Sequence, residues 1–315
     1  MLFRSFSSNS GGSWTAGTGS SFNVAAGSYS TGQVQARQTD RAGNLSAANT
    51  TFGSFTVDTA AAAPSLSLAA DTGASSSDRV TKNASITISG LETGASWEYS
   101  TNSGGSWTAG SGSSFTVAAG TYSIGQVQAR QTDLAGNLSN ASNSFGAFTV
   151  DIAAATPSLA LAADTGFFSS DRVTNNASIT ISGLEAGASW EYSTNSGSSW
   201  TAGTGSSFTV SAGSYSAGQV QARQTDLAGN LSAANTTFGS FTMDTPATAP
   251  SLALAADTGS SNSDRLTKNA TITISGLETG ASWEYSTNSG SSWTAGAGSS
   301  FSVAAGSYEI GRAHV

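Results

Sequence analysis

The sequence lacks cysteine and contains a single histidine, and these absences exclude several chemistries at the outset. Without cysteine the chain has no disulfide, zinc–thiolate site, iron–sulfur cluster or cysteine nucleophile. One histidine cannot form a multi-histidine metal site, and it argues against a Ser-His-Asp triad. No base is then available to activate the many serine and threonine hydroxyls, so we do not expect an enzyme.

Charge is also scarce. Charged residues make up 10% of the chain and the formal net charge is −8, whereas about a quarter is usual. An acidic chain with scattered bases is a poor partner for nucleic acid or anionic lipid. No apolar run approaches the roughly 18 residues of a membrane span. We therefore predict no nucleic-acid partner and no membrane insertion.

What the sequence does contain is a long repeat. Four tryptophans, Trp14, Trp107, Trp200 and Trp293, each follow the one before by 93 residues. QVQARQTD occurs at 33–40, 126–133 and 219–226, and SWEYSTNSG at 96–104, 189–197 and 282–290. This period is too long for a solenoid repeat but suits a small domain. The chain is therefore interpreted as an array of small domains.

The repeat also predicts the boundaries. Two full units span 64–151 and 157–244, the C-terminal part of a unit spans 1–58, and the N-terminal part of another spans 250–308. The first, second and third joints are DTAAAAPSL (58–66), DIAAATPSL (151–159) and DTPATAPSL (244–252). Such short Ala- and Pro-bearing linkers restrict swivelling more than Gly/Ser tethers do. The part-units lack strands, so we expect them to be disordered or swapped between chains.

The last seven residues depart from the repeat. Where the pattern calls for a continuation like SIGQVQAR, the chain reads EIGRAHV at 309–315. A common sequencing-library adapter would encode these residues, so we expect them to be read-through and not protein. His314 lies within this segment.

Within a unit, short alternating segments predict strands. The segments are SLSLA (65–69), SITISGL (85–91), WEYS (97–100), SFTV (114–117), IGQVQARQT (124–132) and FGAFTV (145–150). Clusters of Gly, Ser, Asn and Asp separate them, and no apolar period of 3.6 residues appears. We predict an all-β fold of tandem immunoglobulin-like antiparallel β-sandwiches. The expected core is Trp97, Ile86, Ile88, Phe115, Val127, Phe148 and their copies.

The acidic residues recur at six places in the unit, and only Glu309 falls outside this scheme. In the predicted topology Asp71 and Asp78 lie near the exit residue Asp151. Glu92 and Asp133 lie at the opposite end, near the incoming Asp58. Each joint would then gather carboxylates from two neighbouring units. The corresponding residues in later copies are Asp164, Asp171, Asp244, Glu185, Asp226, Asp257 and Asp264.

Clustered carboxylates repel one another unless a cation neutralises them, and hard oxygen ligands on flexible loops suit Ca²⁺. We expect calcium first in the loop DTGASSSD (71–78), the DTG loop, and second at the Glu92/Asp133 end. The alternative is that Asp-Thr-Gly and the Asp-x-Ala-Gly-Asn loop (133–137 and its copies, the AGN loop) are simply turns. Both descriptions can hold together, because calcium loops are turns.

The unit resembles the bacterial immunoglobulin-like repeats of giant surface adhesins, the biofilm-associated and RTX-type proteins. WEYSTNSGGSWT, QVQARQTDLAGN, FTVD and SLALAADTG…SDRVT carry the resemblance, over about residues 4–308. It implies secreted extender modules at the cell surface whose calcium-loaded linkers and loops stiffen a rod that projects a distal adhesive domain. Implied partners are neighbouring repeats and, through distal domains, a surface or glycan. By resemblance the acidic motif positions are Asp71, Asp78, Asp164, Asp171, Asp257 and Asp264, with the linker residues Asp58, Asp151 and Asp244.

Two rival functions remain. A carbohydrate-binding module would stack sugars on Trp97, Tyr99 and Trp107, but the first two alternate on one strand face, where burial is the default. A glycosidase would need two carboxylates in a cleft, whereas every acid here repeats in every copy.

Arg130 is expected to pair with the cross-strand acid Glu98.

Overall fold

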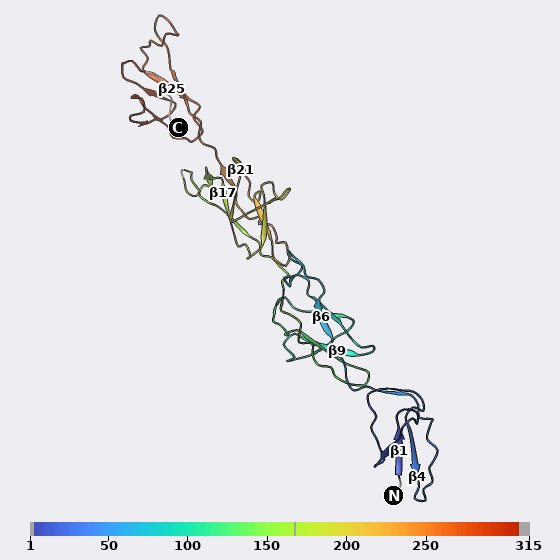
Figure 1. The fold of residues 1–315 in the computed structure, drawn as a ribbon. Coiled ribbons are helices and arrows are strands. Elements are labelled where there is room, and N and C mark those ends of the chain that lie inside the picture. The colour runs from blue at the N-terminus through green and yellow to red at the C-terminus, as the bar shows by residue number, and fades with distance from the viewer. Residues whose placement is uncertain (1–2, 167, 309–315) are drawn as a thin grey trace.

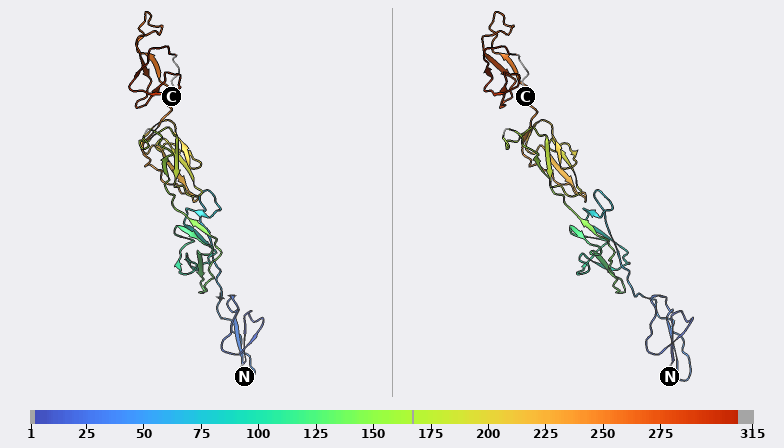
Figure 2. Two further views of the ribbon diagram at one scale, coloured as in Figure 1. Left: turned by 90° about the vertical axis from the view of Figure 1, so that its left-hand side faces the viewer. Right: turned by 60° about the vertical axis from the view of Figure 1, so that its left-hand side comes forward.

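The computed structural model describes residues 3–166 and 168–308, and its regular structure consists of β-strands with no helix in those residues. The chain forms an elongated row of β-rich bodies, with the N-terminus at one end and the last body at the other (Figures 1 and 2). The all-β prediction is therefore confirmed.

The first full unit carries nine strands, three more than the alternating segments predict. They are β6 (Ser65–Leu68), β7 (Val80–Thr81), β8 (Ser85–Ser89), β9 (Ser96–Ser100), β10 (Thr108–Ala109), β11 (Ser114–Thr116), β12 (Gly120–Tyr122), β13 (Gln128–Thr132) and β14 (Phe148–Val150). They pair in the orders β11-β8-β6, β10-β9-β13 and β12-β14-β7. The additional strands β7, β10 and β12 are too short for a period of two to be visible.

The second full unit repeats this pattern, in the sheet orders β15-β17-β20, β19-β18-β22 and β16-β23-β21. Its strands are β15 (Ser158–Leu161), β16 (Val173–Thr174), β17 (Ser178–Ser182), β18 (Ser189–Ser193), β19 (Thr201–Ala202), β20 (Ser207–Thr209), β21 (Gly213–Tyr215), β22 (Gln221–Thr225) and β23 (Phe241–Met243).

The part-units also hold small sheets. Residues 1–58 contain β1 (Phe3–Ser7), β2 (Thr15–Gly17), β3 (Gly27–Tyr29), β4 (Gln35–Thr39) and β5 (Phe55–Val57). Residues 250–308 contain β24 (Ser251–Leu254), β25 (Thr271–Ser275), β26 (Glu284–Tyr285), β27 (Thr294–Ala295) and β28 (Ser300–Ser302). Disorder or swapping of these parts in solution stays a prediction. The segment 309–315 lies outside the described residues.

Each full unit closes around a tryptophan. Ile86 and Ile88 alternate inward from β8, and Trp97 points inward from β9 while its indole N–H donates to the Gly112 carbonyl at 3.1 Å. All six predicted core residues of this unit are buried in one cluster. The equivalent cluster in the second full unit is built around Trp190. The core prediction is confirmed because strand alternation places every second side chain on the same face.

The expectation of wholly antiparallel sheets is wrong in one detail. β7 runs parallel to β14, with Thr149 opposite Val80, and β16 runs parallel to β23 in the same way. These pairs satisfy the second edge of β14 and of β23, which would otherwise expose unpaired backbone groups. The partner segment arrives from the DTG loop, far away in sequence, so a local pattern cannot reveal it.

Among the described residues, none belongs to a helix with the length and apolar character that a membrane crossing requires.

Candidate metal centre

Two joints gather carboxylates from both of the units that they connect. At the first joint Asp58, Glu92 and Asp133 each place a carboxylate oxygen within 4.8 Å of the others, and at the second joint Asp151, Glu185 and Asp226 do the same. In each trio one residue belongs to the linker, one follows a strand that ends near the linker, and one opens the AGN loop. The proximity expected for Asp58, Glu92 and Asp133 is therefore present.

Local turn chemistry sets the positions of the two loop carboxylates. Glu92 sits in a turn whose backbone closes with the Ala95 N–H donating to the Glu92 carbonyl at 3.1 Å. Asp133 accepts the Asn137 backbone N–H at 2.8 Å through Oδ1 and the Asn137 side-chain amide at 2.7 Å through Oδ2. Gly136 supplies the positive φ, +88°, that this tight turn requires.

The linker itself is bonded to the unit that follows it. At the first joint the Glu92 carboxylate accepts the Ala62 N–H at 2.7 Å, and the Gln131 side-chain amide donates to the Ala62 carbonyl at 2.7 Å. The Asn137 side chain donates to the Asp58 carbonyl at 3.1 Å. The second joint repeats these bonds through Glu185, Gln224 and Asn230. The carboxylates therefore lie on backbone that is already held in place.

Sequence reasoning missed the residues that anchor the linker. Gln131 is fully buried at the end of β13, although a glutamine in a strand is usually read as facing solvent. The signal was available, because Val127, Ala129 and Gln131 occupy alternating positions and therefore share the inward face. Glu278, the third copy of Glu92, was also absent from the predicted set, and it accepts the Thr248 N–H at 3.2 Å.

Hydrogen bonding tunes the charge of this site. The Asn137 side-chain amide, which donates to Asp133, lowers the pKa of Asp133 below its ordinary value, and burial opposes this only in part. Asp40, in the equivalent turn of the leading part-unit, has its pKa lowered by Asn44 in the same way. Asp133 is therefore ionised at neutral pH, and its negative charge faces two further carboxyl groups.

The geometry suits a hard divalent cation. Oxygens that bind Ca²⁺ lie 2.3–2.6 Å from the ion, so two ligands on opposite sides of it are about 5 Å apart. Carboxylate oxygens within 4.8 Å of one another are therefore close enough to reach one ion. The joints thus contain acidic groups that can hold a metal ion.

The DTG loop, the site expected first, uses its carboxylates differently. Asp71 accepts the Arg79 N–H at 3.0 Å through Oδ2, and Asp78 accepts the Val80 N–H at 3.0 Å. The remaining Asp71 oxygen, Oδ1, is buried without a hydrogen-bond partner. Asp164 and Asp171 in the second full unit, and Asp257 and Asp264 in the trailing part-unit, make the same turn bonds. Asp164 and Asp257 also have a buried oxygen without a partner.

Among the described residues, no trio of neighbouring carboxylates includes a DTG-loop aspartate or Asp244. Asp244 caps the start of its own linker by accepting the Thr245 N–H at 2.9 Å. The DTG loop therefore contains the turn hydrogen bonds that its alternative interpretation, as a simple turn, requires. The unpartnered oxygen leaves each loop one strong acceptor for a cation or a water.

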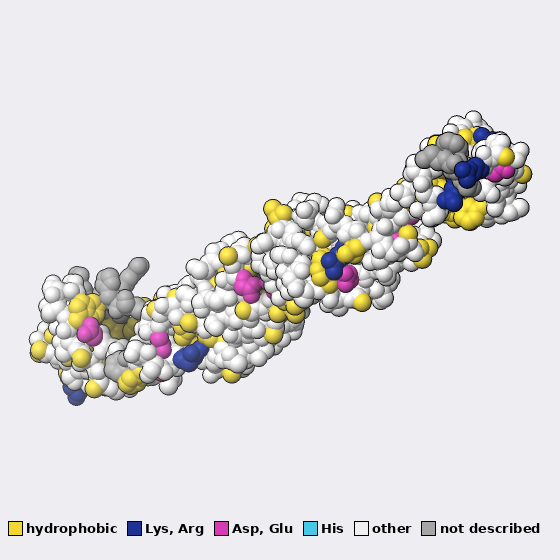
Figure 3. All heavy atoms as spheres, turned by 90° about the horizontal axis from the view of Figure 1, so that it is seen from below, with side chains coloured by type: hydrophobic (Ala, Val, Ile, Leu, Met, Phe, Trp, Pro, Cys, Tyr) yellow, Lys and Arg dark blue, Asp and Glu magenta, His cyan; other side chains and the backbone are white. Residues whose placement is uncertain are grey.

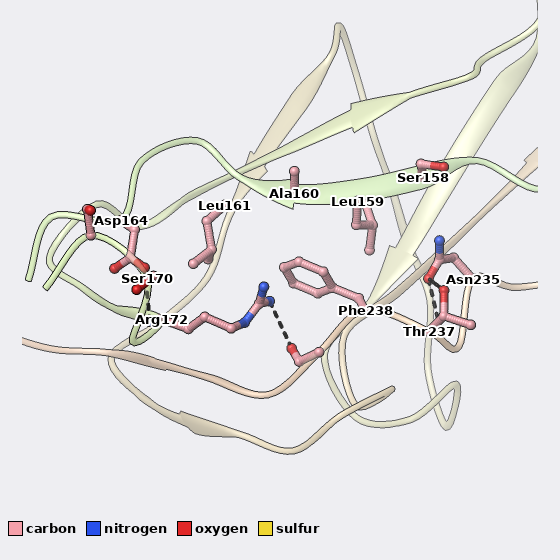
Figure 4. Close-up of a pocket in the computed structure, with 12 residues that line it drawn as sticks. Ser158, Leu159, Ala160, Leu161, Asp164, Ser170, Arg172, Asn235, Thr237 and Phe238 are labelled. Carbon is pink, nitrogen blue, oxygen red and sulfur yellow. Dashed lines mark hydrogen bonds between the residues drawn. The ribbon is translucent and has the colours of Figure 1, made fainter.

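A cavity of about 580 Å³ lies beside one of these loops in the second full unit. Figure 4 shows Asp164 and Arg172 on one side and Leu159, Phe238 and Asn235 on the other. Arg172 donates to the backbone carbonyls of Gly239 and Ser240, at 3.1 and 2.6 Å. Asp164 is the single carboxylate among the residues that line this cavity, so the cavity lacks the carboxylate pair that glycoside hydrolysis uses.

The aromatic residues that a carbohydrate-binding module would use are mostly covered by other side chains. Trp97 is buried, and Tyr99 packs against the same core. Trp107 carries the Arg130 guanidinium 4.0 Å from its ring centroid, and Arg130 is in turn paired with Glu98 at 2.6 Å. The predicted Arg130–Glu98 pair is confirmed. Arg223 covers Trp200 at 4.0 Å in the same manner.

Comparison with protein-family models gives no match, and comparison with curated proteins gives no significant relative.

Proposed function

We propose that this chain is an extender segment of a secreted bacterial surface adhesin, in which calcium stiffens a tandem array that projects a distal binding domain. The proposed units are immunoglobulin-like sandwiches. The buried tryptophan on a central strand and the small sheets packed around it support this assignment. The repeat resemblance supports the role in cell adhesion or biofilm formation.

The observation that carries the proposal is the carboxylate trio at each of the first two joints. Because each trio draws on two successive units, a cation bound there links those units. Calcium also cancels the repulsion between the carboxylates, which otherwise favours an open joint. Binding to the folded joint stabilises it by RT ln(1 + [Ca²⁺]/Kd), about 1.4 kcal/mol at ten times Kd.

The surface fits a spacer. On the face drawn in Figure 3, acidic side chains are spaced along the row, and most of the surface is neither charged nor hydrophobic. The rival function of carbohydrate binding is less well supported, because an arginine covers Trp107 and another covers Trp200.

Calorimetric titration of the full chain with calcium tests the proposal. Wild-type protein is expected to bind calcium at the first and second joints at millimolar concentrations or below. Glu185→Gln combined with Asp226→Asn is expected to remove the second-joint site. Glu191→Gln is the matched control, since Glu191 belongs to the same unit but pairs with Arg223 away from the joint.

X-ray scattering supplies the mechanical readout. The maximum dimension of the wild-type chain should increase with calcium and decrease with chelator, and Glu92→Gln combined with Asp133→Asn, at the first joint, should show a smaller change. The proposal is contradicted if the chain binds no calcium at millimolar levels, or if its maximum dimension is the same with calcium and with chelator.

A further inference from the structure

One AGN loop is buried while its identical copy is exposed. Residues 133–137 and 226–230 share the sequence DLAGN. Ala228 is 0% exposed, whereas its equivalent Ala135 is exposed; Leu227 is 38% exposed and Leu134 is 81% exposed. Since the sequences are the same, a neighbouring segment must cover the second copy.

That segment is the DTG loop of the preceding unit together with the residue that follows β7. The Thr72 hydroxyl donates to the Ala228 carbonyl at 2.8 Å, and the Lys82 ammonium donates to the Gly229 carbonyl at 2.8 Å. Both bonds run from the first full unit to the second, across the second joint. Nothing before residue 58 corresponds to the DTG loop, which is why Ala135 has no such cover in this chain.

The contact depends on two glycines. Gly73 has a φ of +106°, and a Cβ atom on it would lie 1.9 Å from the Leu227 carbonyl oxygen. A Cβ on Gly229 would lie 3.0 Å from the Cα of Gly73. The two backbones therefore meet at a distance that a side chain at residue 73 would prevent.

Individual residues of the DTG loop differ between its copies. Gly166 and Gly259, the equivalents of Gly73, lack a positive φ, and their loops fold back so that a Cβ would approach the Val173 and Leu266 carbonyls instead. The Thr165 hydroxyl donates to the Asn175 side chain at 2.7 Å, whereas Thr72 donates across the joint. The backbone at Gly73 therefore differs from the backbone at Gly166 and Gly259.

From these contacts we propose that the DTG loop is a docking surface for the AGN loop of the next unit, and that this docking sets the orientation of successive units without metal. The partner is a second copy of the same unit, attached in the C-terminal direction. The inference rests on the tandem arrangement of the proposed function but not on calcium.

The residue at position 82 and its equivalents should determine how tightly a DTG loop docks. Lys82 spans the joint, while its equivalent in the second full unit is Asn175, which bonds within its own loop. A joint formed by a loop with lysine gains a charge-assisted hydrogen bond that a joint formed by a loop with asparagine lacks.

Spin-label distances in the full chain test the proposal, because the absence of native cysteine allows clean labelling. Thr108→Cys with Thr201→Cys spans the docked second joint, and Thr15→Cys with Thr108→Cys spans the first joint, which has no DTG loop. All three positions are exposed strand residues at equivalent places of the repeat. With chelator present, the second-joint distance distribution is expected to be narrow and the first-joint distribution broad.

Ala228→Lys should abolish the narrow distribution, and the matched Ala135→Lys should leave it unchanged. Lys82→Asn introduces the residue that the second full unit has at the equivalent position, and it should broaden the second-joint distance distribution. This variant tests the proposal if Ala228→Lys disturbs folding. Equal widths at both joints in chelator, or a narrow distribution that survives Ala228→Lys or Lys82→Asn in folded protein, overturns the proposal. Calcium is absent from every arm, so failure of calcium binding would contradict the proposed function alone.

Discussion

The side-chain amide of Gln131 donates to the Ala62 carbonyl at 2.7 Å, which ties the end of β13 to the linker that enters the same unit. The same amide donates to the Gly90 carbonyl at 3.1 Å, and its oxygen accepts the Glu92 N–H at 2.8 Å. One buried side chain therefore holds the linker and the loop that carries a joint carboxylate.

Replacing Gln131 with methionine of similar size should loosen the first joint. The substitution removes the bonds to the Ala62 carbonyl, the Gly90 carbonyl and the Glu92 N–H, whose residues are exposed or half-buried. The expected cost is therefore about 0.5–1.5 kcal/mol for each bond. Hydrogen exchange of peptides from 64–151 should accelerate. Gln128→Met is the control, because Gln128 lies on the same strand and donates only to the nearby Gly125 carbonyl. Equal exchange in both variants would contradict this role.

Asp133 should titrate below the ordinary range of an aspartate in metal-free buffer. Its pKa is lowered in the folded unit by the Asn137 side-chain amide, so the stability it contributes is present above the unfolded pKa of about 3.9. That stability is lost as the pH falls through the folded pKa. Carboxyl-carbon NMR should follow the titration, and Asn137→Ala should shift the Asp133 midpoint upward. An unchanged midpoint would show that another group sets it.

Gly110 should tolerate no side chain. A Cβ at this position would lie 2.2 Å from the buried Trp97 ring, so Gly110→Ala forces the core to repack, at a cost of about 1–3 kcal/mol. Hydrogen exchange in the strands of the first full unit is the measurement. Gly146→Ala is the matched control, since its Cβ would make ordinary contact with the Arg79 side chain at 3.4 Å. A Gly110→Ala unit as stable as the control would refute this packing.

Removing Arg130 should uncover Trp107. The pair with Glu98 is partly exposed, and such surface pairs contribute about 0–1 kcal/mol, so the expected loss of stability is small. The environment of the indole should change more, and 5-fluorotryptophan NMR resolves it. Arg130→Ala is expected to move the Trp107 signal, while Arg223→Ala moves that of Trp200. Movement of neither signal would mean that the arginines do not cover these rings.

Strand alternation in SITIS and SWEYS was enough to predict β8, β9 and the buried residues Ile86, Ile88 and Trp97. The position of Asp133 near Asp58 could also be inferred, because a sandwich topology places alternate loops at opposite ends. The strands β7, β10 and β12 could not be predicted, since two or three residues carry no period. The parallel pairing of β7 with β14 depends on residues that are far apart in sequence.

By itself, the sequence determined the 93-residue repeat, the β character of the units and the residues that form their cores, because these follow from local alternation and from comparison of the copies. Only the tertiary structure decided which copy of DLAGN is covered. Ala135 and Ala228 have the same neighbours in sequence and hence the same local preferences. They differ in burial because one joint brings a DTG loop against the AGN loop and the other does not.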